Sequence, residues 1–156
     1  MTYLDFKADG TSNGEQTCTN YALVKANDTA WGAAGGEIKM TEDVAAEADD
    51  TPLEVPADKT VTLDLNGHTI DRALTAAMAN GNVITVNGAL TVTDSSATDT
   101  QAGSGKITGG YITGSYAQYG GGVYVYGNGA TFTMKDGSIS GNSTSYNFDG
   151  LRVLCE

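Results

Sequence analysis

The sequence predicts an all-β protein, and its repeats favour a parallel β-helix, which is a solenoid of short stacked strands. Three observations carry this prediction: a composition that favours strands and turns, apolar residues that alternate with a period of two, and strands that recur along the chain. Glycine and threonine each supply 21 of the 156 residues, and they favour turns and strands over helices. With 40% hydrophobic and 17% charged residues, the chain is typical of one folded domain.

Residues 1–34 are expected to form a small N-terminal cap segment. A turn is expected at Asp9-Gly10. The segment 19–31 fits a short helix or an edge strand, because its apolar positions do not decide between the two periods. Trp31, at the end of that segment, is expected to pack in the core or the cap.

Residues 35–145 are expected to form the β-helix repeats. In the segment 60–70, Leu63 and Leu65 alternate with polar residues such as Thr62, so the apolar side chains should face the interior. The strands are short and end at glycine or Asn-Gly, which excludes long helices from this region. The same alternation gives the full set of expected interior positions: Val61, Leu63, Leu65, Ile70, Ile84, Val86, Leu90, Val92, Val123, Val125, Phe132, Met134 and Ile139.

The strands also repeat. The segment 84–94 matches the segment 123–136 apart from residues added at the turn, and each is followed by a similar ending, at 105–110 and 137–142. The segment 60–70 is a shorter version of the same unit. Recurring short strands are typical of a solenoid. Their spacing of about 40 residues corresponds to two coils or to one long coil.

An antiparallel sandwich is the alternative fold. The Asn-Gly pairs permit either fold, since they suit both type I′ hairpin turns and the left-handed corners of a β-helix. We favour the β-helix, because a sandwich has no reason to repeat its sequence. The pairs in question are Asn66-Gly67, Asn80-Gly81, Asn87-Gly88 and Asn128-Gly129.

Within residues 35–145, six motifs together resemble the right-handed β-helix repeats of adhesin-like surface proteins from gut bacteria of the Firmicutes type. The resemblance implies a right-handed, pectate-lyase-like β-helix, and a secreted or cell-surface parent protein. The function that the resemblance implies is mostly unassigned, and the family has no agreed catalytic residues to carry over. We expect a structural or adhesive module without catalysis. The motifs are GGEIKMTEDV, VTLDLNGHTI, ITVNGALTVTDSS, GKITGG, GGGVYV and FTMKDGSISGN.

Residues 146–156 depart from the repeat and are expected to form a C-terminal tail or cap. Leu151, Val153 and Leu154 suit a last strand or a cap. An open coil end exposes apolar residues and unpaired backbone groups. We therefore expect self-association through the C-terminal end, or a tail folded over it, with these three side chains buried in either case.

Charge and cysteine usage exclude several partners. The net charge is −11, with −9 in residues 1–72 and −2 in residues 73–156, and the 8 basic residues are not clustered. This argues against nucleic acid and anionic membrane as partners, and no apolar run reaches the roughly 18 residues of a membrane span. The acidic residues between 43 and 58 lack EF-hand spacing, so we expect no metal and no cofactor. Whether Cys18 and Cys155 form a disulfide stays open.

Ligand binding is expected on exposed tyrosines. Because Tyr124 and Tyr126 alternate with Val123 and Val125, they should lie on the outer face of one strand. Tyrosine gives low-entropy contact surface for sugars and proteins, although these residues also suit a shielding role on the sheet. The expected set is Tyr111, Tyr116, Tyr119, Tyr124 and Tyr126, five of the eight tyrosines.

A polysaccharide lyase or glycoside hydrolase on the same fold is the alternative function. Its candidate catalytic cluster is Asp64, His68, Asp71 and Arg72, with Asp64 expected to point to solvent because it alternates with leucines. The positions equivalent to Asp64 on neighbouring coils are threonines, so the paired carboxylates of glycoside hydrolysis cannot be identified. Asp94 and Asp136 match each other across the repeats, but each directly precedes a turn, and turn formation explains both.

Overall fold

The computed structural model describes residues 2–6, 12–17, 36–47, 50–113, 120–145 and 151–154. Every named element in these ranges is a β-strand, which confirms the all-β class. The whole segment 19–31, which includes Trp31, lies outside the described ranges. So do these other residues singled out from the sequence: Asp9, Gly10, Cys18, Tyr116, Tyr119 and Cys155.

The described strands are short, and most have two to five residues. They are β1 (Thr2–Phe6), β2 (Ser12–Thr17), β3 (Gly36–Lys39), β4 (Val44–Ala45), β5 (Leu53–Val55), β6 (Thr60–Asp64), β7 (Thr69–Asp71), β8 (Ile84–Val86), β9 (Ala89–Thr93), β10 (Lys106–Thr108), β11 (Tyr111–Ile112), β12 (Val123–Tyr126), β13 (Thr131–Met134), β14 (Ser138–Ile139), β15 (Ser143–Thr144) and β16 (Leu151–Leu154).

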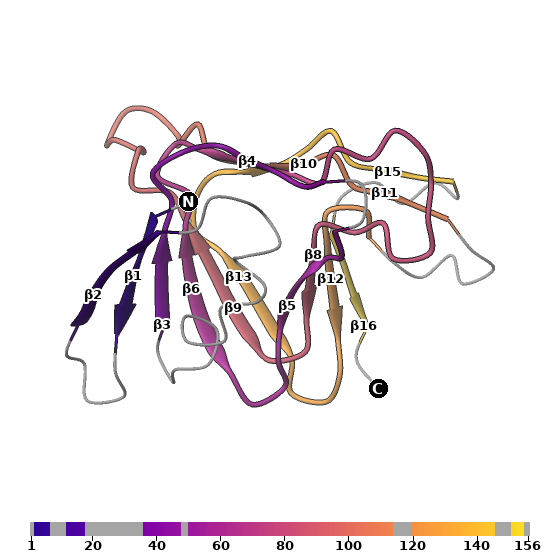
Figure 1. The fold of residues 1–156 in the computed structure, drawn as a ribbon, viewed down its shortest axis with the longest axis horizontal. Helices are drawn as coiled ribbons and strands as arrows, with labels where there is room; N and C mark the ends of the chain where they lie inside the picture. Colours follow the sequence, from indigo (N-terminus) through magenta and orange to yellow (C-terminus); the bar gives the residue numbers. More distant parts are fainter. Residues whose placement is uncertain are drawn as a thin grey trace.

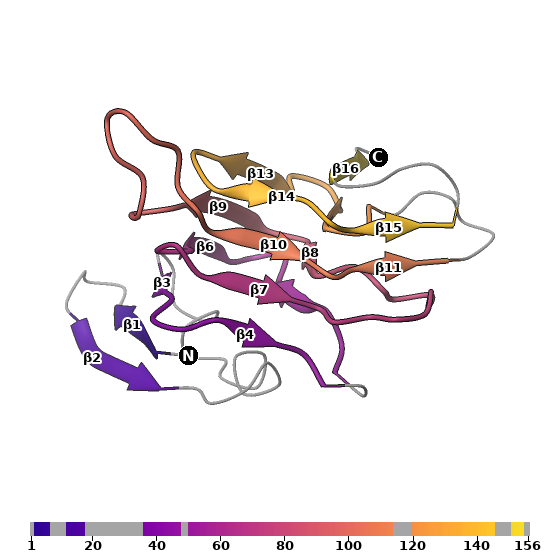
Figure 2. The ribbon, with the colours of Figure 1, turned by 90° about the horizontal axis from the view of Figure 1, so that it is seen from above.

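Twelve of these strands form three four-stranded sheets, whose orders are β3-β6-β9-β13, β4-β7-β10-β14 and β5-β8-β12-β16. All neighbours in these sheets are parallel. The chain therefore visits the three sheets in the same order four times, in passes that we number from the N-terminus: 36–55, 60–86, 89–126 and 131–154. Figure 1 shows the three sheets facing one another, and Figure 2 shows the strands of one sheet side by side.

Parallel pairing excludes one of the two folds expected from the sequence. Among the named strands only β1 and β2 pair as antiparallel neighbours, so the antiparallel sandwich is excluded for the described strands. β1 lies beside β3 at the N-terminal side of the first sheet (Figure 1). β11 and β15 add a separate parallel pair.

The strand register shows that the sequence repeat is one long pass. Ile84 of β8 pairs with Val123 of β12, and Leu90 of β9 pairs with Phe132 of β13. The segments that match in sequence are therefore direct neighbours in space, and the spacing of about 40 residues does not cover two coils. β16 pairs with β12, which confirms the expected last strand.

The interior is the apolar set that the alternation predicts. Ten of the thirteen expected interior residues are fully buried, with Ile38, Met40, Leu53, Val55, Val83 and Ile107 beside them. Phe132, Met134 and Ile139 pack against this core but are only half-buried. They lie on β13 and β14, which are edge strands with a described neighbour on one side only.

The four Asn-Gly pairs expected to form corners or hairpin turns do not share one conformation. Asn66 and Gly67 have φ of 48° and 81°, and Leu65 accepts a hydrogen bond from the N–H of His68 at 2.8 Å, which makes a type I′ turn. In Asn128-Gly129 only the glycine is left-handed, with φ of 81°.

The expectation of left-handed corners is wrong for Asn80-Gly81 and Asn87-Gly88, which have no positive φ. Their glycines are required by space instead. A Cβ on Gly81 would lie 1.9 Å from the carbonyl oxygen of Tyr111, and one on Gly88 would lie 2.2 Å from that of Pro56.

Candidate functional site

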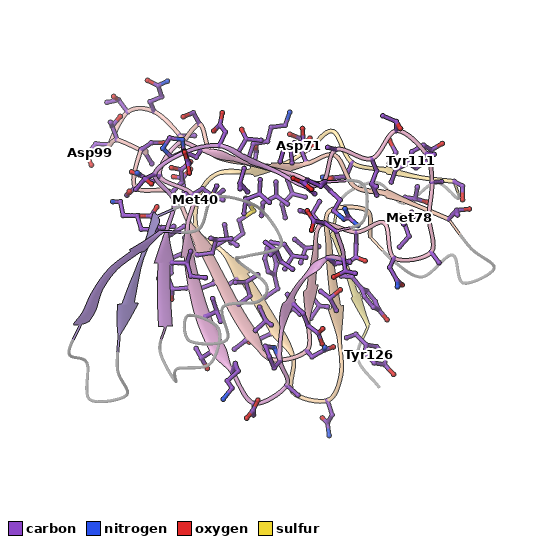
Figure 3. All side chains as sticks on the ribbon, in the orientation of Figure 1. Met40, Asp71, Met78, Asp99, Tyr111 and Tyr126 are labelled. Atoms are coloured by element: carbon purple, nitrogen blue, oxygen red, sulfur yellow. The ribbon has the colours of Figure 1, made fainter. Side chains whose placement is uncertain are left out.

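The outer face of β12 carries two neighbouring tyrosines. Val123 and Val125 are buried, whereas Tyr124 is half-buried and Tyr126 is 43% exposed. The two tyrosine rings stack, with centroids 5.7 Å apart and planes 22° apart. Figure 3 shows Tyr126 projecting outward from the molecule. The structure thus confirms that this tyrosine pair lies on the outer face.

Polar side chains lie beside the tyrosine pair on the same sheet. The register aligns Tyr124 with Thr85 of β8, and Thr85 with Glu54 of β5. These three residues form one row across the sheet, with about 4.8 Å between neighbouring strands. Asn87 donates from Nδ2 to Oε1 of Glu54 at 2.9 Å, and Asn82 donates from Nδ2 to Oγ1 of Thr85 at 2.8 Å.

The row places hydrogen-bonding groups next to aromatic faces. Such a combination suits a ligand that is apolar on one side and carries hydroxyl or amide groups at its rim. The sequence-based reasoning missed Glu54 and Asn87. A signal for Glu54 was present, because it lies between the apolar residues Leu53 and Val55 in a strand with period two.

The other tyrosines do not extend this pair in the described structure. Tyr111 is half-buried on β11, which pairs with β15 rather than with the sheet of β12. Figure 3 labels Tyr111 and Tyr126 on different strands. Tyr116 and Tyr119 lie outside the described residues, so their predicted role stays a prediction.

Asp64, from the alternative catalytic cluster, is buried and only 4% exposed. Its Oδ1 accepts hydrogen bonds from the backbone N–H groups of Asn66 at 3.0 Å and Ser95 at 2.8 Å, and its Oδ2 lies 3.3 Å from Nζ of Lys39. The prediction that Asp64 points to solvent is therefore wrong. Alternation along β6 places this side chain outside the apolar core. Ser95 at the corner of the third pass and Lys39 of the first pass nevertheless cover it.

His68 and Asp71 each contact a residue outside the cluster. Nδ1 of His68 lies 3.3 Å from Oδ1 of Asp43, and the same oxygen accepts the N–H of Thr69 at 2.8 Å. Oδ1 of Asp71 accepts the N–H of Ala73 at 2.7 Å. Asp71 thus closes a local turn, and Asp43 connects the first pass to the start of β7 in the second.

Arg72 is buried, with 1% of its surface exposed. Its Nη2 donates to the carbonyl oxygen of Asp50, so the guanidinium connects the second pass to the turn region of the first. A side chain so deeply buried is not presented to a substrate at the surface.

Asp94 holds the corner that follows β9 and is 3% exposed. Oδ1 accepts the N–H groups of Gly67 at 2.8 Å and Ser96 at 3.0 Å and the hydroxyl of Ser96 at 2.7 Å, while Oδ2 accepts the N–H of Gly105 at 2.5 Å. Burial raises the pKa of Asp94, but hydrogen bonds from Ser96, Gly105 and Gly67 together outweigh it, so its pKa lies below the usual value.

Asp136 repeats this role one pass later. Its Oδ1 accepts the N–H groups of Gly103 at 2.8 Å and Gly137 at 2.7 Å. Turn formation therefore accounts for both this residue and Asp94, as the sequence predicts. In the ranges that the structure describes, no group of three or more His, Cys, Asp or Glu side chains is placed to hold a metal ion.

Comparison with known proteins gives no match: no family model, no curated protein and no solved structure is similar to the chain. No helix long and apolar enough to cross a membrane occurs among the described residues. The function must therefore be argued from the residues themselves.

Proposed function

We propose that the chain is a non-catalytic, adhesive module of a bacterial cell-surface or secreted protein, and that it binds carbohydrate through the outer face of β12. The exposed, stacked pair of Tyr124 and Tyr126 carries this proposal. The resemblance of the motifs to adhesin-like repeats supports the surface location.

The proposed fold is a right-handed parallel β-helix. Four passes through three parallel sheets in a constant order support it, as does the strong preference of parallel crossover connections for the right hand. In such a stack each outer sheet face is a rigid surface, because its strands are fixed by neighbours on both sides. β12, between β8 and β16, has such a position.

A sugar fits this surface for two reasons. Stacked tyrosine rings present a flat apolar area that is already ordered, so binding freezes little side-chain motion. Glu54 and Asn87 supply a carboxylate and an amide close by, which can bond to hydroxyl groups. A lyase or hydrolase is not favoured, because Asp64 and Arg72 are buried and each contacts residues outside the catalytic cluster.

A glycan array probed with the purified chain tests the proposal. We expect binding to a subset of glycans, lost in the double variant Tyr124→Ala/Tyr126→Ala and retained in Thr131→Ala, a matched change at an exposed position on another sheet. A folded chain that binds no glycan, or a double variant that binds as well as the parent, contradicts the proposal. Binding to a protein but to no glycan would mean that the ligand is a protein and not a carbohydrate.

A further inference from the structure

The sequence contains five Asn-Gly pairs, and Asn13-Gly14 lies in β2. The other four, at Asn66, Asn80, Asn87 and Asn128, offer the same spontaneous chemistry in four different settings. The backbone nitrogen of a glycine can attack the side-chain carbonyl carbon of the preceding asparagine, since no glycine side chain obstructs it. The attack needs a free glycine N–H and a mobile asparagine amide. Hydrogen bonds to either group therefore slow the reaction.

In Asn66-Gly67, hydrogen bonds restrain both the glycine N–H and the asparagine side chain. The N–H of Gly67 donates to Oδ1 of Asp94 at 2.8 Å, and a neighbouring carboxylate opposes loss of that proton. Nδ2 of Asn66 donates to the carbonyl oxygen of Met40 at 2.9 Å, and its Oδ1 accepts the hydroxyl of Ser95 at 2.9 Å.

Asn87-Gly88 is held in the same way. The N–H of Gly88 donates to the carbonyl oxygen of Val55 at 3.2 Å, and Nδ2 of Asn87 donates to Glu54. The glycine is also buried.

Asn80-Gly81 is held at one group. Its glycine is buried, and the glycine N–H donates to the carbonyl oxygen of Met78 at 3.2 Å. The side chain of Asn80 is exposed, and no described residue bonds to it.

Asn128-Gly129 is held at neither group by any described residue. Both residues are exposed, and within the described ranges neither the Asn128 side chain nor the Gly129 N–H makes a hydrogen bond. No atom lies within 4 Å of the place where a Gly129 Cβ would be. The turn is closed only by the N–H of Ala130, which donates to the carbonyl oxygen of Gly127 at 3.2 Å.

We infer that Asn128 is the selective deamidation site among these four pairs in the folded protein. The Gly129 nitrogen loses its proton and bonds to Cγ of Asn128, and Nδ2 leaves as ammonia, which gives a succinimide ring. Water then opens the ring at either carbonyl carbon and yields an aspartate or a β-linked isoaspartate. No oxidant or cofactor takes part.

The reaction changes the surface next to the tyrosine pair. It places a new carboxylate two residues after Tyr126, on the turn that connects β12 to β13. The isoaspartate product also lengthens the backbone of that turn by one carbon. The inference does not depend on the proposed carbohydrate binding, because mass spectrometry detects the product directly.

Peptide mapping after incubation of the native full chain at mildly alkaline pH tests this inference. Trypsin leaves Asn66 as the only asparagine of peptide 60–72 and Asn128 as the only asparagine of peptide 107–135. Peptide 73–106 holds both Asn80 and Asn87, which fragmentation of the peptide distinguishes, and Asn13 falls in the separate peptide 8–25. We expect the mass increase of deamidation first in peptide 107–135. Each hydrogen bond that must break should slow the other sites about threefold to tenfold.

Two controls separate structure from sequence. In concentrated urea, where these hydrogen bonds are lost, the four sites should convert at similar rates. The variant Asn128→Gln should leave peptide 107–135 unmodified and the others unchanged. If Asn66 or Asn87 converts in the native protein as fast as Asn128, or if urea preserves the native order of rates, the inference is wrong.

Discussion

The corner at residues 64–68 and the turn at residues 127–130 both use an Asn-Gly pair, but they are built in opposite ways. At the first corner, Asp64 and Asp94 are buried and accept backbone N–H groups from two passes. The second turn is exposed and is closed by one backbone hydrogen bond. Polar residues outside the apolar core are therefore of two kinds, those that hold the passes together and those that face the surroundings.

The apolar side chains are also more deeply buried in the third pass than in the fourth. Leu90 and Val92 in the third pass have at most 1% of their surface exposed, because β9 has neighbours on both sides. Phe132 and Met134 occupy the aligned positions in the fourth pass and are half-buried. Stability should therefore be concentrated in the inner passes, and surface chemistry in the outer turn.

The largest expected effect is at Leu65. Leu65→Asp should unfold the protein, because it removes an apolar contact of roughly 2–5 kcal/mol and leaves an unpaired buried carboxylate. Thr62→Asp, which introduces the same residue on the outer face of β6, the strand just before Leu65, should be tolerated. Circular dichroism and urea unfolding measure both. If Thr62→Asp is the more damaging, the inside and outside of β6 are assigned the wrong way round.

Asp94→Ala should cause the second-largest loss of stability. It leaves the N–H groups of Gly67 and Gly105 without their acceptor, at a cost of about 1–3 kcal/mol for each buried group. Asp136→Ala, at the same position one pass later, should cost less because that side chain is only half-buried. Urea midpoints compare the two variants. Equal losses would show that the inner corner is no more important than the outer one.

Stability should also fall in acid because of Asp94. Its pKa is lower in the folded protein than in the unfolded chain. The stabilisation is therefore complete above pH about 4 and is lost as the pH falls through the folded-state value. Asp94→Asn should make the urea midpoint less sensitive to pH below about pH 4. An unchanged pH dependence would mean that other carboxylates control the acid response.

A weaker effect concerns association through the outer pass. The half-buried Phe132, Met134 and Ile139 and the edges of β13 and β14 should favour contact between two copies at this end. The net charge of −11 opposes this contact, so dimerisation should strengthen as salt screens the repulsion. Sedimentation at low and high ionic strength measures it. A monomer at both ionic strengths, with stability unchanged in a chain ending at Ser145, contradicts the expectation.

The sequence predicted the strands and the interior well, because a period of two and a repeat are local signals. Leu63, Leu65, Leu90 and Val92 are buried as expected. Burial of Asp64 was not predicted, because it depends on Ser95 and Lys39 from other passes, and alternation along one strand carries no information about those partners.

The candidate site was predicted in part for the same reason. The outward direction of Tyr124 and Tyr126 follows from alternation within β12. The row that Tyr124 forms with Thr85 and then Glu54 depends on the register between strands of three passes. The repeat indicated the alignment with Thr85, but the segment around Glu54 does not carry the repeated motif.

Amide hydrogen exchange at Gly67 and Gly129, measured by NMR on the folded chain, tests most directly whether the two Asn-Gly turns differ. The N–H of Gly67 donates to the buried Asp94, so it should exchange only when the corner opens. The N–H of Gly129 is exposed and should exchange near the rate of an unfolded chain. Strong protection of Gly67 with none at Gly129 is the predicted result. Similar protection at both glycines would contradict the distinction between a corner that holds the passes together and a turn that faces solvent.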